Sequence, residues 1–353
     1  MKVKSFPLEL SPEHDMIAAS YTPKGSSMIT HRQRLETCLS GNTPDRPPVA
    51  LWRHFPVDDQ SPETLAAATL HWQQQYDWDL VKVTPASSFC LKGWSSEDEW
   101  RGDGEGTRAY TRRVIARPED WARLTVLDPD SPHLAAQLKC LSLLRGQISS
   151  DTPLIQTIFS PLSQAKNLVG GEALIVHLRE NPHAVQKGLE TIAETTRRFI
   201  DAAVRRGIDG IFYAVQHAQA SLLTEAEFVN FGSVMDLSVL ETASSLWFNM
   251  VHLHGENVYF NAVSSYPVQA INWHDRDTAP NLSEGLEQFS GVLCGGLSRD
   301  TIVYGDAAAV SSEAADAIAQ TQGQRLLLGT GCVVPIIAPH GNLLAARKSV
   351  ERQ

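Results

Sequence analysis

The chain has 353 residues, of which 42% are hydrophobic and 20% charged, and its formal net charge is -10 at pH 7. That composition is typical of a globular protein with one large core or two smaller ones. The negative charge, without any run of Lys and Arg, argues against nucleic acid and anionic membrane surfaces as partners. No stretch of about 18 apolar residues offers a membrane span.

Residues 1–28 contain Pro, Ser, Lys and Glu without any periodicity, and we expect them to form an N-terminal arm. No apolar segment follows the basic start, so no signal peptide is expected. The five cysteines are scattered and odd in number, which favours reduced thiols in a cytoplasmic protein over a disulfide framework. We interpret residues 29–353 as a single domain.

Helix-like segments alternate with short apolar runs along this domain. Thr30 and Gln33 form a capping-box pattern at the start of the first predicted helix, and Gly41 is its expected end. Ser61 is the expected N-cap of the next helix, with Glu63 in its first turn. The apolar runs lie at 48–52, 80–85, 153–159, 210–214, 246–255, 270–273, 292–297 and 325–331.

Eight such runs suit strands of a parallel sheet that is buried on both faces. Their alternation with helices indicates an α/β fold of the (β/α)8 TIM-barrel class. The stretch 86–152 is too long for a loop, so we interpret it as an insertion after the second strand. Within it, the Gly-rich "GDGEG" is expected to form the turn of a β-hairpin, because it lacks the spacing of a phosphate-binding loop.

Polar side chains gather near the ends of the predicted strands, where the catalytic groups of this fold lie. Surface loops are polar in every fold, so the clustering favours an active site without establishing one. The residues at these ends are Arg53, His54, Lys82, Gln216, His252, His254, His274, Asp275, Arg276 and Cys332.

His252 and His254 lie two residues apart in the fifth predicted strand, so both side chains point to the same face. With the thiolate of Cys332 from the eighth strand, they would supply three ligands and leave one position open, as in a catalytic zinc site. Cys294 is the competing thiol, but it lies inside an apolar run. In the alternative interpretation, hydrogen bonds satisfy both histidines and Cys332 is a small buried hydrophobe.

The segment "INWHDRDTAP" concentrates three more candidates after the sixth strand. His274 is a potential base, Asp275 a carboxylate and Arg276 a permanently charged donor for anions. The alternative is a loop in which Asp275 or Asp277 caps a helix while Arg276 forms a surface ion pair.

Four residues near the other strand ends are candidates for substrate binding. Arg53 and His54 are placed to bind a substrate carboxylate, or belong to an ordinary loop. Lys82 lies within an apolar run, so its ammonium needs a partner, which is either Asp79 or a ligand. Gln216 is a weaker candidate.

Five segments, in this order, resemble the uroporphyrinogen decarboxylase superfamily. They are "RQRLETCLSGNTPDRPPVALWRH", "YDWDLVKVTP", "HLHGEN", "AINWHDRDTAP" and "LLLGTGCVVP". That superfamily holds the haem-pathway decarboxylase and zinc-dependent methyltransferases that move methyl groups between corrinoids and thiols. The resemblance, which runs from about residue 28 to the end, implies a (β/α)8 barrel that is often dimeric.

The methyltransferase branch carries an H-x-C-G segment and a later G-C. By position these motifs fall on His252, His254 and Gly255, and on Gly331 and Cys332, so one ligand is His instead of Cys. The resemblance implies zinc and methyl transfer to a thiol, with a corrinoid on a partner protein as one candidate donor. We prefer this reading, because the H-x-H and Cys pattern is explained by it.

In that reading the substrate is a small acidic or thiol-bearing molecule. His274 or Asp275 would handle protons, while Arg53 and Arg276 would position the substrate.

The alternative is cofactor-free decarboxylation of uroporphyrinogen or a similar polycarboxylate, as in porphyrin biosynthesis. Arg53, Arg276 and Lys82 would then hold acetate groups, and Asp79 or Asp275 would stabilise a protonated pyrrole. The decarboxylase branch carries an arginine-rich "RQAGRY"-like segment near its first strand, where this chain has only Arg53. A third alternative is a non-catalytic barrel that binds a ligand.

Overall fold

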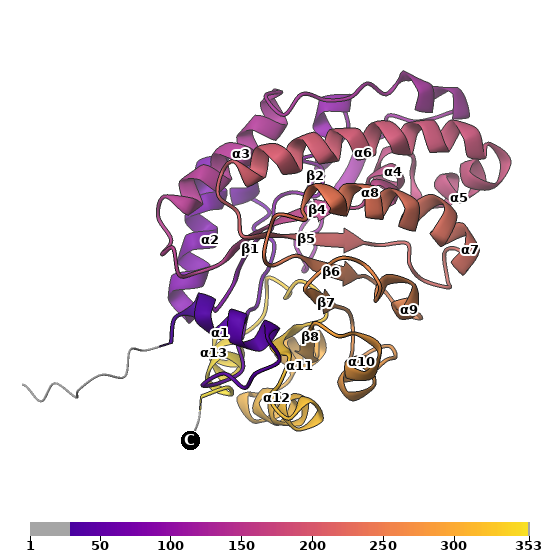
Figure 1. Cartoon of the computed structure of the whole chain (residues 1–353). Helices are drawn as coiled ribbons and strands as arrows, with labels where there is room; N and C mark the ends of the chain where they lie inside the picture. The colour runs from indigo at the N-terminus through magenta and orange to yellow at the C-terminus, as the bar shows by residue number, and fades with distance from the viewer. Residues whose placement is uncertain (1–28, 352–353) are drawn as a thin grey trace, which may run out of the picture.

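A parallel β-sheet organises the fold, and its strands follow one another across the sheet in chain order (Figure 1). The computed structural model describes residues 29–351, so the predicted arm, residues 1–28, lies outside the described residues. Each predicted apolar run from 80–85 onward contains a strand of this sheet. The strands, in sheet order, are β1 (Val81–Val83), β4 (Leu154–Phe159), β5 (Gly210–Val215), β6 (Met250–Leu253), β7 (Ala270–Asn272), β8 (Val292–Leu297) and β9 (Leu326–Thr330).

Helices connect these strands and pack around the curled sheet (Figure 1). The α-helices of the described residues are α1 (His31–Leu39), α2 (Pro62–Tyr76), α3 (Pro132–Arg145), α4 (Pro161–Val169), α5 (Gly171–Glu180), α6 (Pro182–Val204), α7 (Glu225–Phe228), α8 (Val234–Thr242), α9 (Phe260–Val263), α10 (Leu282–Gln288), α11 (Arg299–Tyr304), α12 (Ala307–Thr321) and α13 (His340–Lys348). The short 3-10 helices are η1 (Asp58–Gln60), η2 (Lys92–Trp94) and η3 (Pro118–Arg123), and a π-helical turn, η4 (Val229–Ser233), joins α7 to α8. Within the described residues, none of the helices has the length and apolarity needed to traverse a bilayer.

The first predicted strand, 48–52, forms a single parallel bridge between Val49 and Leu328 of β9. The amide of Ala50 donates to the Leu328 carbonyl at 3.0 Å, and the Leu328 amide donates to the Pro48 carbonyl at 2.8 Å. Pro48 has no N–H, so the ladder cannot extend toward the N-terminus there. The structure therefore shows an α/β fold with a curled parallel sheet of seven strands, and the closed eight-stranded barrel stays a prediction.

The predicted hairpin lies between β1 and β4. Strands β2 (Glu97–Glu99) and β3 (Ala109–Arg112) pair in antiparallel fashion, and the "GDGEG" segment lies in the connection between them. Arg108 anchors this hairpin through buried ion pairs with Asp98 and Asp59, at 3.1 and 3.2 Å. The Gly104 carbonyl accepts a hydrogen bond from the amide of Ile336 at 2.8 Å, which ties the turn to the segment after β9. The domain boundaries and the limits 86–152 stay predictions.

Helix α1 begins with the predicted capping box. The Thr30 hydroxyl accepts from the Gln33 amide at 3.2 Å, and the Gln33 side chain accepts from the Thr30 amide at 3.0 Å. Gly41 follows the helix with φ +75°, a conformation that glycine adopts without strain. Ser61 caps α2 as predicted, with Glu63 in the first turn.

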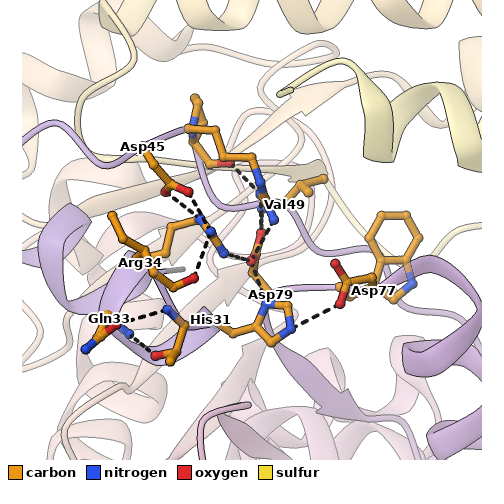
Figure 2. Close-up of polar contacts among 12 residues, drawn as sticks. His31, Gln33, Arg34, Asp45, Val49, Asp77 and Asp79 are labelled. Carbon is orange, nitrogen blue, oxygen red and sulfur yellow. Dashed lines mark hydrogen bonds and ion pairs between the residues drawn. The ribbon is translucent and has the colours of Figure 1, made fainter. Parts of the chain in front are cut away.

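Asp79 is fully buried just before β1 and joins α1 to the sheet (Figure 2). Its carboxylate accepts hydrogen bonds from His31 at 2.8 Å, from Arg34 at 2.7 Å and from Arg46 at 2.6 Å. It also accepts from the amide of Val49 at 2.8 Å, while its own amide donates to the Val49 carbonyl at 2.9 Å. Asp79 therefore holds the segment before residue 50 against β1, at the N-terminal end of that strand.

We predict that Asp79→Asn lowers the free energy of unfolding by about 3–5 kcal/mol, because the buried Arg34 and the half-buried Arg46 lose the carboxylate that they share. Urea denaturation followed by circular dichroism measures this loss. The control is Glu97→Gln in the exposed pair with Arg112, which should change stability by less than about 0.5 kcal/mol. Equal effects of both substitutions would contradict the structural role of Asp79.

Candidate metal centre and cavity

The strand register places one layer of side chains on the same side of the sheet. Ala214 of β5 pairs with His252 of β6, His252 with Asn272 of β7, and Asn272 with Cys294 of β8. Paired residues of neighbouring parallel strands point the same way, and so does His254, two residues after His252. Because Ala214, His252 and His254 all line one cavity, this layer faces the space enclosed by the curled sheet.

Four potential ligand atoms meet at this end of the sheet. The side-chain nitrogen or sulfur atoms of His252, His254, His274 and Cys332 all lie within 4.8 Å of one another. The structure thus brings together the three predicted metal ligands, and it adds His274, which the sequence suggested for proton transfer. Cys294, the competing thiol, is buried in the core, where burial raises its pKa, and it is not part of this group.

Asn272 determines which nitrogen of His252 is available. Its amide nitrogen donates to the carbonyls of Cys294 at 2.8 Å and Thr330 at 3.1 Å. Its amide oxygen must therefore face His252, whose Nδ1 lies 2.7 Å away. An oxygen acceptor at that distance requires a proton on Nδ1, so the lone pair of His252 is on Nε2. A residue that hydrogen-bonds to the other ring nitrogen commonly orients a metal-binding histidine.

His274 is held in the loop after β7 with one nitrogen engaged and one free. Its Nδ1 lies 3.3 Å from the carboxylate of Asp277, while its Nε2 is buried without a hydrogen-bond partner. Gly331 packs against its backbone, since a Cβ at that position would lie 2.6 Å from the Cα of His274. This close approach brings the next residue, Cys332, to the imidazoles.

Cys332 lies among three imidazoles, with its sulfur 3.8 Å from Nδ1 of His254. Burial alone would raise the pKa of its thiol. The three neighbouring imidazoles, those of His252, His254 and His274, outweigh burial and hold the pKa of Cys332 well below the usual value of a thiol. This shift favours the thiolate, the form that binds metals and acts as a nucleophile.

These residues fit a zinc ion. In a tetrahedral site with nitrogen and sulfur ligands, the ligand atoms are about 3.3–3.6 Å apart, slightly closer than in this cluster. The sulfur of Cys332, the free Nε2 of His252 and the imidazole of His254, whose Nδ1 lies 3.8 Å from that sulfur, are donors of the kind that zinc takes.

A cavity of about 500 Å³ adjoins the cluster and is lined by His252, His254 and Cys332. Its size suits a small organic molecule. Three of the predicted substrate-binding residues, His54, Lys82 and Gln216, also line it.

Lys82 is the most buried of these three residues. Its Nζ lies 3.3 Å from the Thr84 hydroxyl, and over the rings of Phe212 and Trp52 at 4.4 and 5.6 Å from their centres. Burial lowers the pKa of Lys82 to about 7, and burial together with the Lys82 charge lowers the pKa of His54 to about 4. The partner suggested for Lys82, Asp79, makes no contact with it and is bound to arginines instead.

Four predicted site residues are placed outside the cavity. Arg53 stacks on Trp72 and donates to the Ile336 carbonyl. Arg276 donates to the Gly296 carbonyl and pairs with Asp316 of α12, which matches the ion-pair alternative. Asp275 is buried against the Gly296 amide at 3.0 Å, and burial raises its pKa to about 6.

The fourth residue, Asp79, lies before β1, at the end of the strand opposite to the cluster. None of these four placements supports the role in catalysis or substrate binding that the sequence suggested. Each of these four side chains contacts another group of the protein instead.

Sequence reasoning missed Lys166 of α4 and Arg113, which follows β3; both line the cavity. The Lys166 ammonium lies 3.5 Å from the amide oxygen of Gln216. No motif marks either residue. A lysine within the otherwise buried "PLSQAKNLV" was the one available signal for Lys166.

Comparisons with known proteins give a family and a number of structural likenesses, two of which are described below. The family model described as uroporphyrinogen decarboxylase (URO-D) matches residues 30–353. No curated protein matches the chain. A methyltransferase from Methanosarcina mazei superposes with a TM-score of 0.80 at 18% identity, over 91% of this chain and 98% of that chain.

A B12-independent methionine synthase from Shewanella sp. W3-18-1, in complex with selenomethionine, superposes with a TM-score of 0.57 at 15% identity. The match covers 86% of this chain and 92% of that chain. At such identities, both likenesses show the fold alone.

We predict that Asn272→Leu changes the tautomer of His252 in metal-free protein, because Nδ1 loses its acceptor. Nitrogen-15 NMR of histidine-labelled protein should show a proton on Nδ1 in the wild type and a mixture of tautomers in the variant. A wild-type His252 with its proton on Nε2 would contradict the assignment.

We also predict that Cys332 reacts as a thiolate. The rate of its alkylation by iodoacetamide in metal-free protein should change little between about pH 6.5 and 8.5. An ordinary thiol would gain nearly tenfold in rate per pH unit up to its pKa of about 8.5. Mass spectrometry identifies the modified residue, and Cys332→Ser is the control.

Proposed function

Because the chain belongs to the uroporphyrinogen decarboxylase family, as its motifs predicted, we propose that it is an enzyme that transfers a methyl group to a substrate thiol with the help of zinc. One observation carries this proposal. Three imidazoles and one low-pKa thiol meet within 4.8 Å of one another, beside a cavity of small-molecule size. The fold shared with a methyltransferase over 91% of the chain is consistent with it.

His252, His254 and Cys332 would hold the ion, which leaves one position for a substrate. When bound, zinc supplies a Lewis acid that lowers the pKa of a thiol, so that a thiolate nucleophile is available at neutral pH. The remaining tasks belong to the protein. Asn272 keeps Nε2 of His252 free of a proton, and the strand register keeps both histidines on the cavity side.

We assign the proton of the substrate thiol to His274. Its Nε2 is buried and unpartnered, and the carboxylate of Asp277 lies 3.3 Å from its other nitrogen. Burial disfavours the imidazolium, but the interactions with Cys332 and Asp277 outweigh it and raise the pKa of His274. A group with this combination accepts a proton readily and keeps it.

The methyl donor in this proposal is a corrinoid carried by a partner protein, and the acceptor is a small molecule with a thiol. This part rests on the family alone. Dimerisation and a cytoplasmic location likewise stay predictions from the sequence.

Decarboxylation of a porphyrinogen receives no support from the site. The two arginines that would hold acetate groups, Arg53 and Arg276, donate to backbone carbonyls away from the cavity. The carboxylate suggested for the pyrrole, Asp79, is surrounded by His31, Arg34 and Arg46 at the other end of its strand. The cluster of three histidines and a cysteine beside the cavity also argues against a non-catalytic barrel that only binds a ligand.

We predict that the purified protein binds one zinc ion and that His254→Ala loses it. Elemental analysis after dialysis measures the stoichiometry, and zinc K-edge absorption should show one sulfur among nitrogen ligands. The matched control is His71→Ala, at an exposed histidine on α2, which should keep its zinc. A folded wild type that takes up no zinc would reject the proposal.

His274→Ala separates metal binding from proton transfer. It should keep zinc and lose methyl transfer from methylcobalamin to a thiol, measured as thioether by mass spectrometry. Loss of zinc in this variant would instead make His274 a metal ligand.

A further inference from the structure

The cavity carries three cationic side chains that have no carboxylate partner among the residues that the structure describes. These are Lys82 on β1, Lys166 on α4 and Arg113 after β3. A fourth cation on the wall, Arg108, is neutralised by Asp59 and Asp98.

The opposite charge is nearly absent from the same wall. Glu105 is the one lining carboxylate in the described part of the chain, and it is bound to Arg299. The thiolate form of Cys332, which also lines the cavity, offsets at most one of the three basic side chains. The interior therefore stays positive, and cationic ligands are disfavoured there by like-charge repulsion.

Lys166 and Arg113 form the most exposed part of this positive wall. Arg113 donates to the carbonyls of Asn167 at 2.8 Å and Lys166 at 3.3 Å, and its guanidinium lies 5.3 Å from the ring centre of Tyr110. Burial and the Arg113 charge together lower the pKa of Lys166. The Lys166 ammonium and the Arg113 guanidinium are like charges that lie side by side. Only the neutral oxygen of Gln216 is near the ammonium, so these groups lack the oppositely charged partner that they normally have.

Several aromatic residues provide the rest of the wall. Trp52, Tyr110, Phe159 and Phe212 line the same cavity, so an occupant needs an apolar body as well as a charged end. The planar guanidinium of an arginine matches the bidentate geometry of a carboxylate, and the neighbouring lysine adds a point charge.

We propose that Lys166 and Arg113 form an anion subsite that binds the carboxylate of a small organic acid. Gln216 supports the Lys166 ammonium, and the aromatic wall holds the body of the acid. The inference rests on the proposed function only in making this acid the thiol acceptor. The charge of the wall selects acids over amines.

The test compares thiols of similar size and different charge on the protein as purified. Isothermal titration calorimetry would measure 3-mercaptopropionate, 2-mercaptoethanol and cysteamine, which are an anion, a neutral molecule and a cation. We expect the anion to bind most tightly and the cation most weakly. Lys166→Met should weaken binding of 3-mercaptopropionate by about 10- to 100-fold and leave 2-mercaptoethanol unchanged.

Lys187→Met, at an exposed lysine on α6, is the matched control and should bind all three thiols as the wild type does. Equal affinity of the acid and the neutral thiol, or no effect of Lys166→Met, would overturn the subsite. Arg113→Met gives a second, independent variant with the same expectation.

Pentanoate, which has no thiol, separates this inference from the zinc chemistry. If pentanoate binds and depends on Lys166, the subsite stands even when the protein takes up no zinc. If pentanoate binds equally to the wild type and Lys166→Met, the subsite fails, whatever the metal content.

Discussion

One buried amide connects the strands that build the candidate metal centre. Asn272 of β7 contacts His252 of β6 through its oxygen, and through its nitrogen it binds the carbonyls of Cys294 in β8 and Thr330 in β9. A single side chain thus sets the orientation of one imidazole and the position of the strand that leads to Cys332. Because all three of its hydrogen bonds are buried, a shift of any of these strands leaves a polar group without a partner.

The site has two parts, which come from different strands of the sheet. The imidazoles and the thiol come from β6, β7 and β9 or the residues just after them, which Asn272 holds together. The unpaired cations Lys82, Arg113 and Lys166 come from β1, the hairpin and α4. The potential metal ligands therefore lie on the later strands, while the unpaired basic side chains lie on the earlier half and its insertion.

Alternation of residues along a strand was enough to predict that His252 and His254 share a face, and strand order placed Cys332 beside them. The alternation of apolar runs with helices likewise predicted the α/β fold class. Arg53, Asp79, Asp275 and Arg276 show the limit of this reasoning. A polar residue beside a strand has the same pattern whether it faces a cavity or a buried partner, and partners such as Asp316 are distant in sequence. Lys166 and Arg113 were missed because a helix and a hairpin carry them to the cavity.

The charges of the two parts act on the same reactant. A divalent metal held by neutral imidazoles and a single thiolate keeps a net charge of about +1, whereas a second thiolate would cancel it. The unpaired cations of the wall add to that field. A thiol that enters as an organic acid is therefore attracted by its carboxylate at one end and loses its proton more easily at the other. In the proposed enzyme, a histidine at position 254 in place of a cysteine ligand and the basic wall would both favour anionic substrates.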